Sequence, residues 1–100
     1  MARPRSELSD ILHELCENVY FQPPTGTKLV YPCIIYSNEQ IESNHADNAP
    51  YALYVRYSIK YITRDPDNEV RFALARLPMC ASEKFYTSDN LYHYPFRLYF

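Results

Sequence analysis

The stretch that most constrains the fold of this chain is Tyr51–Thr63, a run of thirteen residues in which large apolar side chains alternate with mostly polar ones. The apolar side of this alternation consists of Leu53, Val55, Tyr57, Ile59 and Tyr61. The other side consists of Ala52, Tyr54, Arg56, Ser58 and Lys60. A period of two is typical of a β-strand with one face on a core. At 3.3 Å per residue such a strand is about 43 Å long, so we expect it to extend beyond the core of a small domain or to bend.

The length and composition of the chain favour a single domain over residues 1–100. Its apolar runs are too short to cross a bilayer, and the N-terminal segment MARPRSELSD lacks the apolar region of a signal peptide. The net charge of −2 argues against a protein that grips phosphate backbones, because such binding depends on clustered Lys and Arg. We therefore expect a protein that is made and kept in the cytoplasm, with no membrane partner and no specific nucleic-acid ligand.

Two amphipathic helices are predicted from the spacing of apolar residues. The first covers Glu7–Val19 with Ser6 as its N-cap, because its apolar residues recur at the helical spacings of three and one. These residues are Leu8, Ile11, Leu12, Leu15, Cys16 and Val19. The second helix begins with Asp65 as N-cap and Pro66 as its first residue, and it ends before Pro78. Its apolar stripe consists of Val70, Ala73, Leu74 and Leu77.

Four strands complete the prediction: Leu29–Tyr36, Tyr51–Thr63, Ala81–Thr87 and Tyr92–Phe100. The last two are expected to form a hairpin, because Ser88–Asn90 has the residues of a tight turn. Pro95 places the early part of the last strand at an edge or a bulge. The sequence therefore predicts an α+β fold of order α-β-β-α-β-β, with two helices packed on one face of a four-stranded, mainly antiparallel sheet.

The segment Ser37–Pro50 is polar and has little periodicity, so it is predicted to be a fourteen-residue loop that projects as an arm between two paired strands. Loops of this length are often functional, and a merely mobile connection is the alternative. The candidate interface residues are Asn44, His45 and Asp47 in this loop, and Arg56 and Lys60 on the polar side of the long strand. An ordinary solvated face is the favoured explanation of that polar side, and a protein contact is the alternative.

Three cysteines cannot all pair within one chain and show no CxxC spacing, so buried, reduced thiols are expected. A nucleophilic thiol would need a neighbouring base. Cys33 or Cys80 could meet His45 or His93 for this purpose. A small thiol-dependent enzyme is therefore the alternative from another functional class, although both cysteines lie in apolar segments.

No cofactor or metal site is predicted. His45 and Asp47 could supply two metal ligands, but no third ligand follows at a sequence spacing typical of metal sites. The acidic cluster of Asp65, Asp67 and Glu69 is not followed by the glycine of a calcium-binding loop. The chain has one glycine, which excludes a glycine-rich phosphate loop.

Six segments together resemble small structural proteins of long-tailed bacteriophages, of the tail terminator or head–tail joining type. They are Phe21–Pro24, Lys28–Tyr36, Ala46–Asn48, Asp65–Asp67, Leu77–Cys80 and Tyr86–Leu91. The resemblance spans nearly the whole chain, and the predicted order of elements is also similar to that of tail terminators. It identifies no interface residue.

The resemblance implies a non-enzymatic virion protein at the head–tail junction, assembled in the host cytoplasm. A homo-oligomeric ring, expected to be a hexamer, would cap the tail tube protein and meet the head connector or head-completion protein. DNA would only pass through the lumen, which suits a mildly acidic chain. A neck or head-completion protein that binds the portal is the structural alternative, and a nucleic-acid-binding module is a third class.

Overall fold

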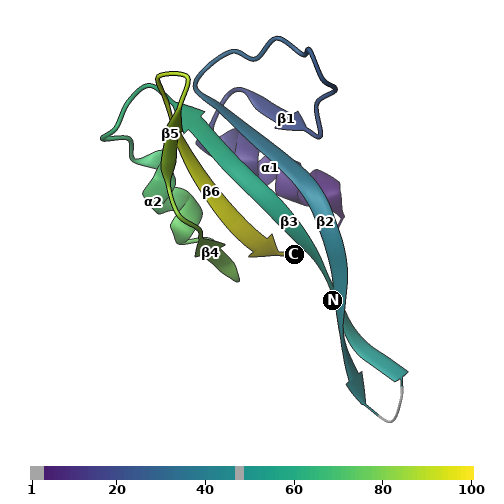
Figure 1. The fold of residues 1–100 in the computed structure, drawn as a ribbon. Coiled ribbons are helices and arrows are strands. Elements are labelled where there is room, and N and C mark those ends of the chain that lie inside the picture. The colour runs from purple at the N-terminus through teal and green to yellow at the C-terminus, as the bar shows by residue number, and fades with distance from the viewer. Residues whose placement is uncertain (1–3, 47–48) are drawn as a thin grey trace.

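The computed structural model describes the backbone of residues 4–46 and 49–100, and the side chains of residues 4–41 and 54–100 (Figure 1). The elements are α1 (Arg5–Leu15), β1 (Val19–Phe21), β2 (Cys33–Ala46), β3 (Ala49–Thr63), α2 (Val70–Ala75), β4 (Cys80–Ser82), β5 (Tyr86–Ser88) and β6 (Leu91–Tyr99). The strands form one sheet in the order β1-β2-β3-β6-β4, and β5 also pairs with β6. All pairs are antiparallel except β1 with β2.

The predicted four-stranded sheet of order α-β-β-α-β-β is wrong, because the sheet has six strands and includes a parallel pair. Two strands account for the difference. β1 begins at Val19, the last residue of the predicted first helix, and continues through Tyr20 and Phe21, which were not predicted to be a strand. The predicted strand Ala81–Thr87 is divided into β4 and β5, which pair with opposite ends of β6. Local periodicity does not show which distant strands pair. The sequence pattern therefore predicted neither β1 nor the division into β4 and β5.

Helix α1 ends at Leu15 rather than Val19, and it begins with Pro4 at its N-cap instead of Ser6. Its last predicted turn is lost because Val19 pairs in parallel with Ile34 of β2, and the Ile34 N–H donates to the Asn18 carbonyl at 2.8 Å. The sheet thus satisfies backbone groups that one more helical turn would have used.

Helix α2 begins at Val70, later than the predicted start at Pro66. Asp65 instead forms a turn, in which its Oδ1 accepts the Asp67 N–H at 3.0 Å. Asn68 is buried, its Oδ1 accepts the Arg71 N–H at 3.0 Å, and its Nδ2 donates to the Asp65 carbonyl at 2.9 Å. Glu69 is the N-cap of α2 and makes no side-chain cap bond, so it is Asn68, one residue earlier, that accepts a first-turn N–H in place of Asp65.

The long strand and its alternation are confirmed wherever side chains are described. Tyr57, Ile59 and Tyr61 of β3 are at most 4% exposed, whereas Arg56 and Lys60 are half-buried on the opposite face. The buried face forms the main core with side chains from both helices, β2 and β6. The fully buried members of this core include Leu8, Leu12, Ile34, Ile59, Leu74 and Phe96.

The C-terminal hairpin is also confirmed. Asp89 and Asn90 have φ values of 53° and 63° between the paired residues Ser88 and Leu91. Positive φ at both central residues matches the right-handed twist of a two-residue hairpin, and Asp and Asn tolerate this conformation. The edge alternative for Pro95 is wrong, because β6 lies inside the sheet. Pro95 does fall at an interruption of the pairing, since β5 pairs with residues 91–93 of β6 and β4 with residues 96–98, and the Pro95 carbonyl accepts the Glu83 N–H at 2.9 Å.

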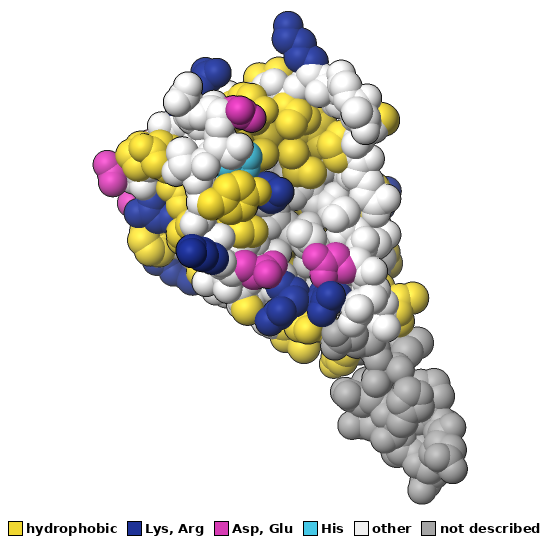
Figure 2. Space-filling model, in the orientation of Figure 1, with side chains coloured by type: hydrophobic (Ala, Val, Ile, Leu, Met, Phe, Trp, Pro, Cys, Tyr) yellow, Lys and Arg dark blue, Asp and Glu magenta, His cyan; other side chains and the backbone are white. Residues whose placement is uncertain are grey.

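A second, smaller cluster covers one end of the opposite face of the sheet. It is built on Cys33, Ile62 and Leu91, and its partly buried members are Tyr20, Leu29, Tyr31 and Ile35. Residues 29–32 belong to a connection that packs here, so β2 begins at Cys33 rather than at the predicted Leu29. Apolar side chains gather at this end of the face in Figure 2, while the rest of the face is more polar.

Candidate assembly surfaces

Strands β2 and β3 continue past the rest of the sheet as a two-stranded hairpin (Figure 1). β6 pairs with β3 only over Arg56–Thr63, and β1 pairs with β2 only at Ile34–Tyr36. We call residues 39–46 and 49–54 the arm. Within the described part of the chain, its residues 42–46 and 49–54 pair as strands only with each other, and Gln40 and Ile41 at its base pair with Arg56 and Val55. The predicted loop Ser37–Pro50 is therefore wrong as a loop, because most of it is strand.

The arm has two open strand edges and an exposed apolar side chain. A two-stranded hairpin is only marginally stable alone in water, and open edges present backbone donors and acceptors to other chains. Ile41, on the arm, is 70% exposed, and its backbone pairs with that of Val55. Because the molecule measures 50 × 26 × 23 Å, it is about twice as long as it is wide. These features are typical of a segment that is completed by contact with another molecule.

The four predicted interface residues whose backbone is described do not form one cluster. Asn44 and His45 lie near the end of β2 in the arm, and Asp47 lies outside the described residues. Arg56 and Lys60 lie on β3 beyond the base of the arm. The Asn44 backbone pairs with Ala52, which is four residues from Arg56, or about 13 Å along the strand.

The face of the sheet opposite the helices carries a group of cations beyond the small apolar cluster. We call this surface the open face, and its half-buried side chains are Ser37, Arg56, Ser58, Lys60, Arg97 and Tyr99. Basic and acidic side chains lie next to one another on this side of the molecule in Figure 2. The sequence singled out Arg56 and Lys60, but it gave no reason to place Arg97 beside them. That proximity depends on the register of β6 against β3, in which Arg97 lies opposite Ser58.

The three cations of the open face have different surroundings. Arg56 Nε donates to Glu39 Oε2 at 2.7 Å. A side-chain hydrogen bond with Tyr99 raises the pKa of Arg56, against a smaller lowering by desolvation, and Glu39 raises it further. Lys60 Nζ lies 5.6 Å from the centre of the Tyr86 ring.

Arg97 contributes an unsatisfied donor to the open face. Its Nε is buried and has no hydrogen-bond partner among the described residues. Arg56 is already matched by Glu39. Exposed Glu83 follows β4 opposite Pro95, on the same side of the sheet as Arg97, so Lys60 and Arg97 leave the open face with one positive charge in excess.

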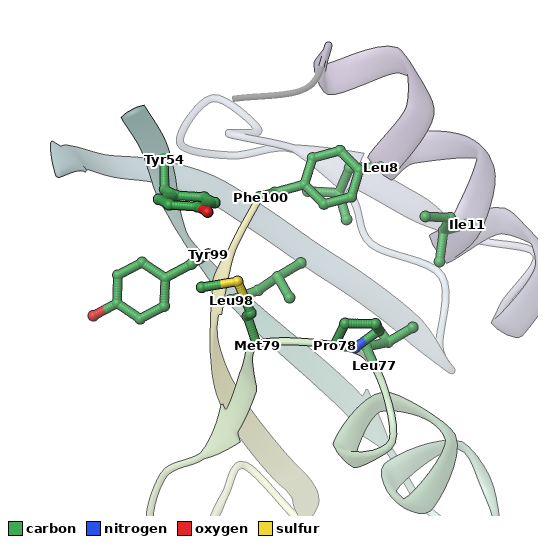
Figure 3. Close-up of a pocket in the computed structure, with 9 residues that line it drawn as sticks. All are labelled: Leu8, Ile11, Tyr54, Leu77, Pro78, Met79, Leu98, Tyr99 and Phe100. Carbon is green, nitrogen blue, oxygen red and sulfur yellow. The ribbon is translucent and has the colours of Figure 1, made fainter. Parts of the chain in front are cut away.

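An apolar pocket lies between α1, the α2–β4 connection and the end of β6 (Figure 3). Its volume is 130 Å³. Its lining consists of Leu8, Ile11, Tyr54, Leu77, Pro78, Met79, Leu98, Tyr99 and Phe100. Cavities of about 150 Å³ with apolar walls hold a benzene-sized group. Apart from the hydroxyl groups of Tyr54 and Tyr99 the lining side chains are apolar, so the pocket suits an apolar side chain.

The thiols lack the surroundings of a nucleophile. Cys33 is fully buried, and burial raises its pKa to about 11. Burial likewise raises the pKa of Cys80 to about 11, and that of Cys16 also lies above its ordinary value. Thiols of this kind carry little thiolate at neutral pH.

His93 does not lie beside Cys33 or Cys80. In the register of the sheet, Ile62 lies between Cys33 and His93, so the two are two strand spacings apart, or about 9.6 Å. Cys80 pairs with Leu98, which is five residues from His93 along β6, or about 17 Å. The side chain of His45 lies outside those described. Cys33 and Cys80 are therefore both beyond hydrogen-bond reach of His93.

The described residues contain no group of three or more His, Cys, Asp or Glu side chains placed to hold a metal ion. Within the same residues, neither helix combines the length and the apolar character needed to cross a bilayer. The arm and the open face thus define the chain as a candidate assembly protein. Comparison with protein-family models, curated proteins and solved structures finds no match for the chain.

Proposed function

We propose that this chain is a non-enzymatic structural subunit that assembles with copies of itself, as the ring that terminates the tail tube of a long-tailed bacteriophage and joins it to the head. The arm carries this proposal, because it is a long hairpin whose strand edges are left open by the described residues of its own chain. The resemblance of six sequence segments supplies the phage context. The order of the elements no longer supports it, because the sheet has six strands.

A ring of identical subunits needs two different surfaces that complement each other, and it closes when the rotation between neighbours permits. The arm projects from one end of the chain's own sheet, and its six residues from Ala49 to Tyr54 span about 20 Å. This reach is similar to the 23 Å and 26 Å short dimensions of the molecule. One copy can therefore touch an adjacent copy through the arm while its core stays a separate unit.

Removal of the arm tests the proposal. Replacing residues 42–54 by Asn-Gly joins Ile41 to Val55, which already pair, through a two-residue hairpin turn. The core and the ion pair of Arg56 with Glu39 remain intact. We expect the shortened protein to keep its unfolding temperature within a few degrees and to lose association. Light scattering and negative-stain images of the protein, alone and mixed with tail tubes, measure association.

The control for this experiment is the full-length chain with Lys28→Glu, an exposed change in the connection before β2. It should fold and associate as the unchanged protein does. A shortened protein that still forms the same assemblies would refute the role of the arm. Failure of the unchanged protein to associate with itself or with tubes under any condition would refute the proposed function. A pull-down against tail tube and portal separates a terminator from a neck or head-completion protein.

A further inference from the structure

We propose that the acidic outer face of α1 in one copy of the chain docks on the open face of the next copy. This inference rests on the proposed self-assembly and names the two surfaces that meet. Each surface is described by side chains outside the arm, so the inference stands on separate observations. The partner is a second copy, because one chain carries both complementary surfaces on opposite sides.

The acidic surface is a stripe along α1 and the residues that follow it. Glu7, Asp10, Glu14 and Glu17 are all exposed and follow one another at spacings of three, four and three residues. Glu7, Asp10 and Glu14 share one side of α1, the buried residues Leu8 and Leu12 occupy another, and Glu17 lies beyond the end of the helix at Leu15.

The nearest cation of α1 is turned away from this stripe. Arg5 NH1 donates to the Tyr36 hydroxyl at 2.9 Å, and its guanidinium lies 4.5 Å from the centre of the Phe21 ring. Arg5 is thus held against the sheet beneath α1. The exposed carboxylates of Asp10 and Glu14 therefore present a negative surface to a neighbouring molecule.

The basic surface is the open face around Lys60 and Arg97. Arg97 is half-buried on this face, so a carboxylate from another molecule can approach the part of its side chain that stays exposed, although its Nε is itself buried. Glu39 already satisfies Arg56, so Lys60 and Arg97 remain as the cations that attract the acidic stripe.

The two surfaces cannot meet within one chain. In Figure 1, α1 lies behind the sheet and the open face points toward the viewer. The side chains agree with this view, because Leu8 and Leu12 pack with Ile59, whereas Lys60 points to the other side of β3. Each copy therefore offers one acidic and one basic surface, and the contact is head-to-tail.

The size of the surfaces indicates a weak contact that the arm strengthens. Three strands over eight residues give the open face about 14 × 26 Å, or about 370 Å². A stable interface covers about 800 Å² on each partner. One face of the two-stranded arm adds about 200 to 300 Å². The open face and the arm together thus approach the size of a stable interface, whereas neither reaches it alone.

Charge reversal provides the test. The sheet variant carries Lys60→Glu and Arg97→Glu, the helix variant carries Asp10→Lys and Glu14→Lys, and the combined variant carries all four changes. We expect each double variant alone to associate at least tenfold more weakly than the unchanged protein, because like charges then meet. The combined variant and an equimolar mixture of the two double variants should regain association, because opposite charges meet again. Sedimentation at 50 mM and 500 mM salt measures this, and the unchanged protein should associate less at high salt.

The matched control is Lys28→Glu with Arg76→Glu, which makes the same charge change at exposed positions outside the open face. It should associate as the unchanged protein does, and circular dichroism should show that every variant is folded. Double variants that associate normally, or a combined variant that is no better than either, would overturn the inference and leave the proposed function standing. Salt-sensitive retention of DNA that the sheet variant loses would also overturn it, because the open face would then bind nucleic acid.

Discussion

The thiols of this protein should react slowly with iodoacetamide while the chain is folded. Desolvation raises the pKa of both Cys33, which is buried, and Cys80, which is half-buried, to about 11. At pH 8 a thiol with this pKa is about 0.1% thiolate, whereas an ordinary thiol of pKa 9 is about 10% thiolate. Since the thiolate is the reactive form, burial slows alkylation about 100-fold through ionisation alone. The rate should rise about tenfold per pH unit until the pH approaches 11.

Mass spectrometry of timed samples resolves the labelling of each cysteine. The control is the same chain unfolded in urea, in which all three thiols should react at similar rates. Preferential labelling of Cys33 or Cys80 in the folded protein near pH 6 would refute the reasoning, because it would require a depressed pKa. Such a result would support the alternative function of a thiol-dependent enzyme.

The same burial makes stability depend on pH. An unfolded thiol ionises near pH 9, and folded Cys33 ionises near pH 11, so the folded state holds this proton more tightly. Its contribution to stability is complete below pH 9 and is lost as the pH rises to 11. The loss is about 2 to 3 kcal/mol. In urea titrations from pH 8 to pH 10.5, the unchanged protein should lose more stability than Cys33→Ala, and parallel losses would contradict the prediction.

Two further predictions concern the fold. Leu12→Ala should lower the free energy of unfolding by about 3 kcal/mol in urea titration, because it empties a fully buried site. Exposed Glu14→Ala is its control, and equal effects would contradict the packing of α1. Asn68→Ala should cost about 1 to 2 kcal/mol through the lost cap of α2, and exposed Asp67→Ala should cost less in the same titration. A loss at Asp67 as large as that at Asn68 would contradict the capping role.

The sequence predicted the elements whose signal is local. The alternation of β3 identified the central strand and its buried face, and the apolar spacing of α1 identified Leu8 and Leu12 as core residues. The turn at Asp89 and Asn90 was visible because these two residues tolerate positive φ. The boundaries were less accurate, since Val19 carries the helical spacing but finds a strand partner.

The candidate surfaces were only partly predictable. The segment Ser37–Pro50 was correctly expected to project. Most of it is strand, which the sequence did not predict because the segment is polar and has little periodicity. Arg56 and Lys60 were found from their side of β3, whereas Arg97 was missed. Asn44, His45 and Asp47 were placed with Arg56 and Lys60 in one predicted interface, but strand geometry separates Asn44 from Arg56 by about 13 Å.

The sequence by itself determined which segments have one apolar face and where the tight C-terminal turn lies. These properties depend on neighbours within a few residues, so a period of two or of 3.6 reveals them. Only the tertiary structure decided that β1 joins β2 in parallel, that β4 and β5 share β6, and that Arg97 comes beside Lys60. These contacts depend on the pairing of distant strands, where a shift of one residue would turn every side chain to the other face.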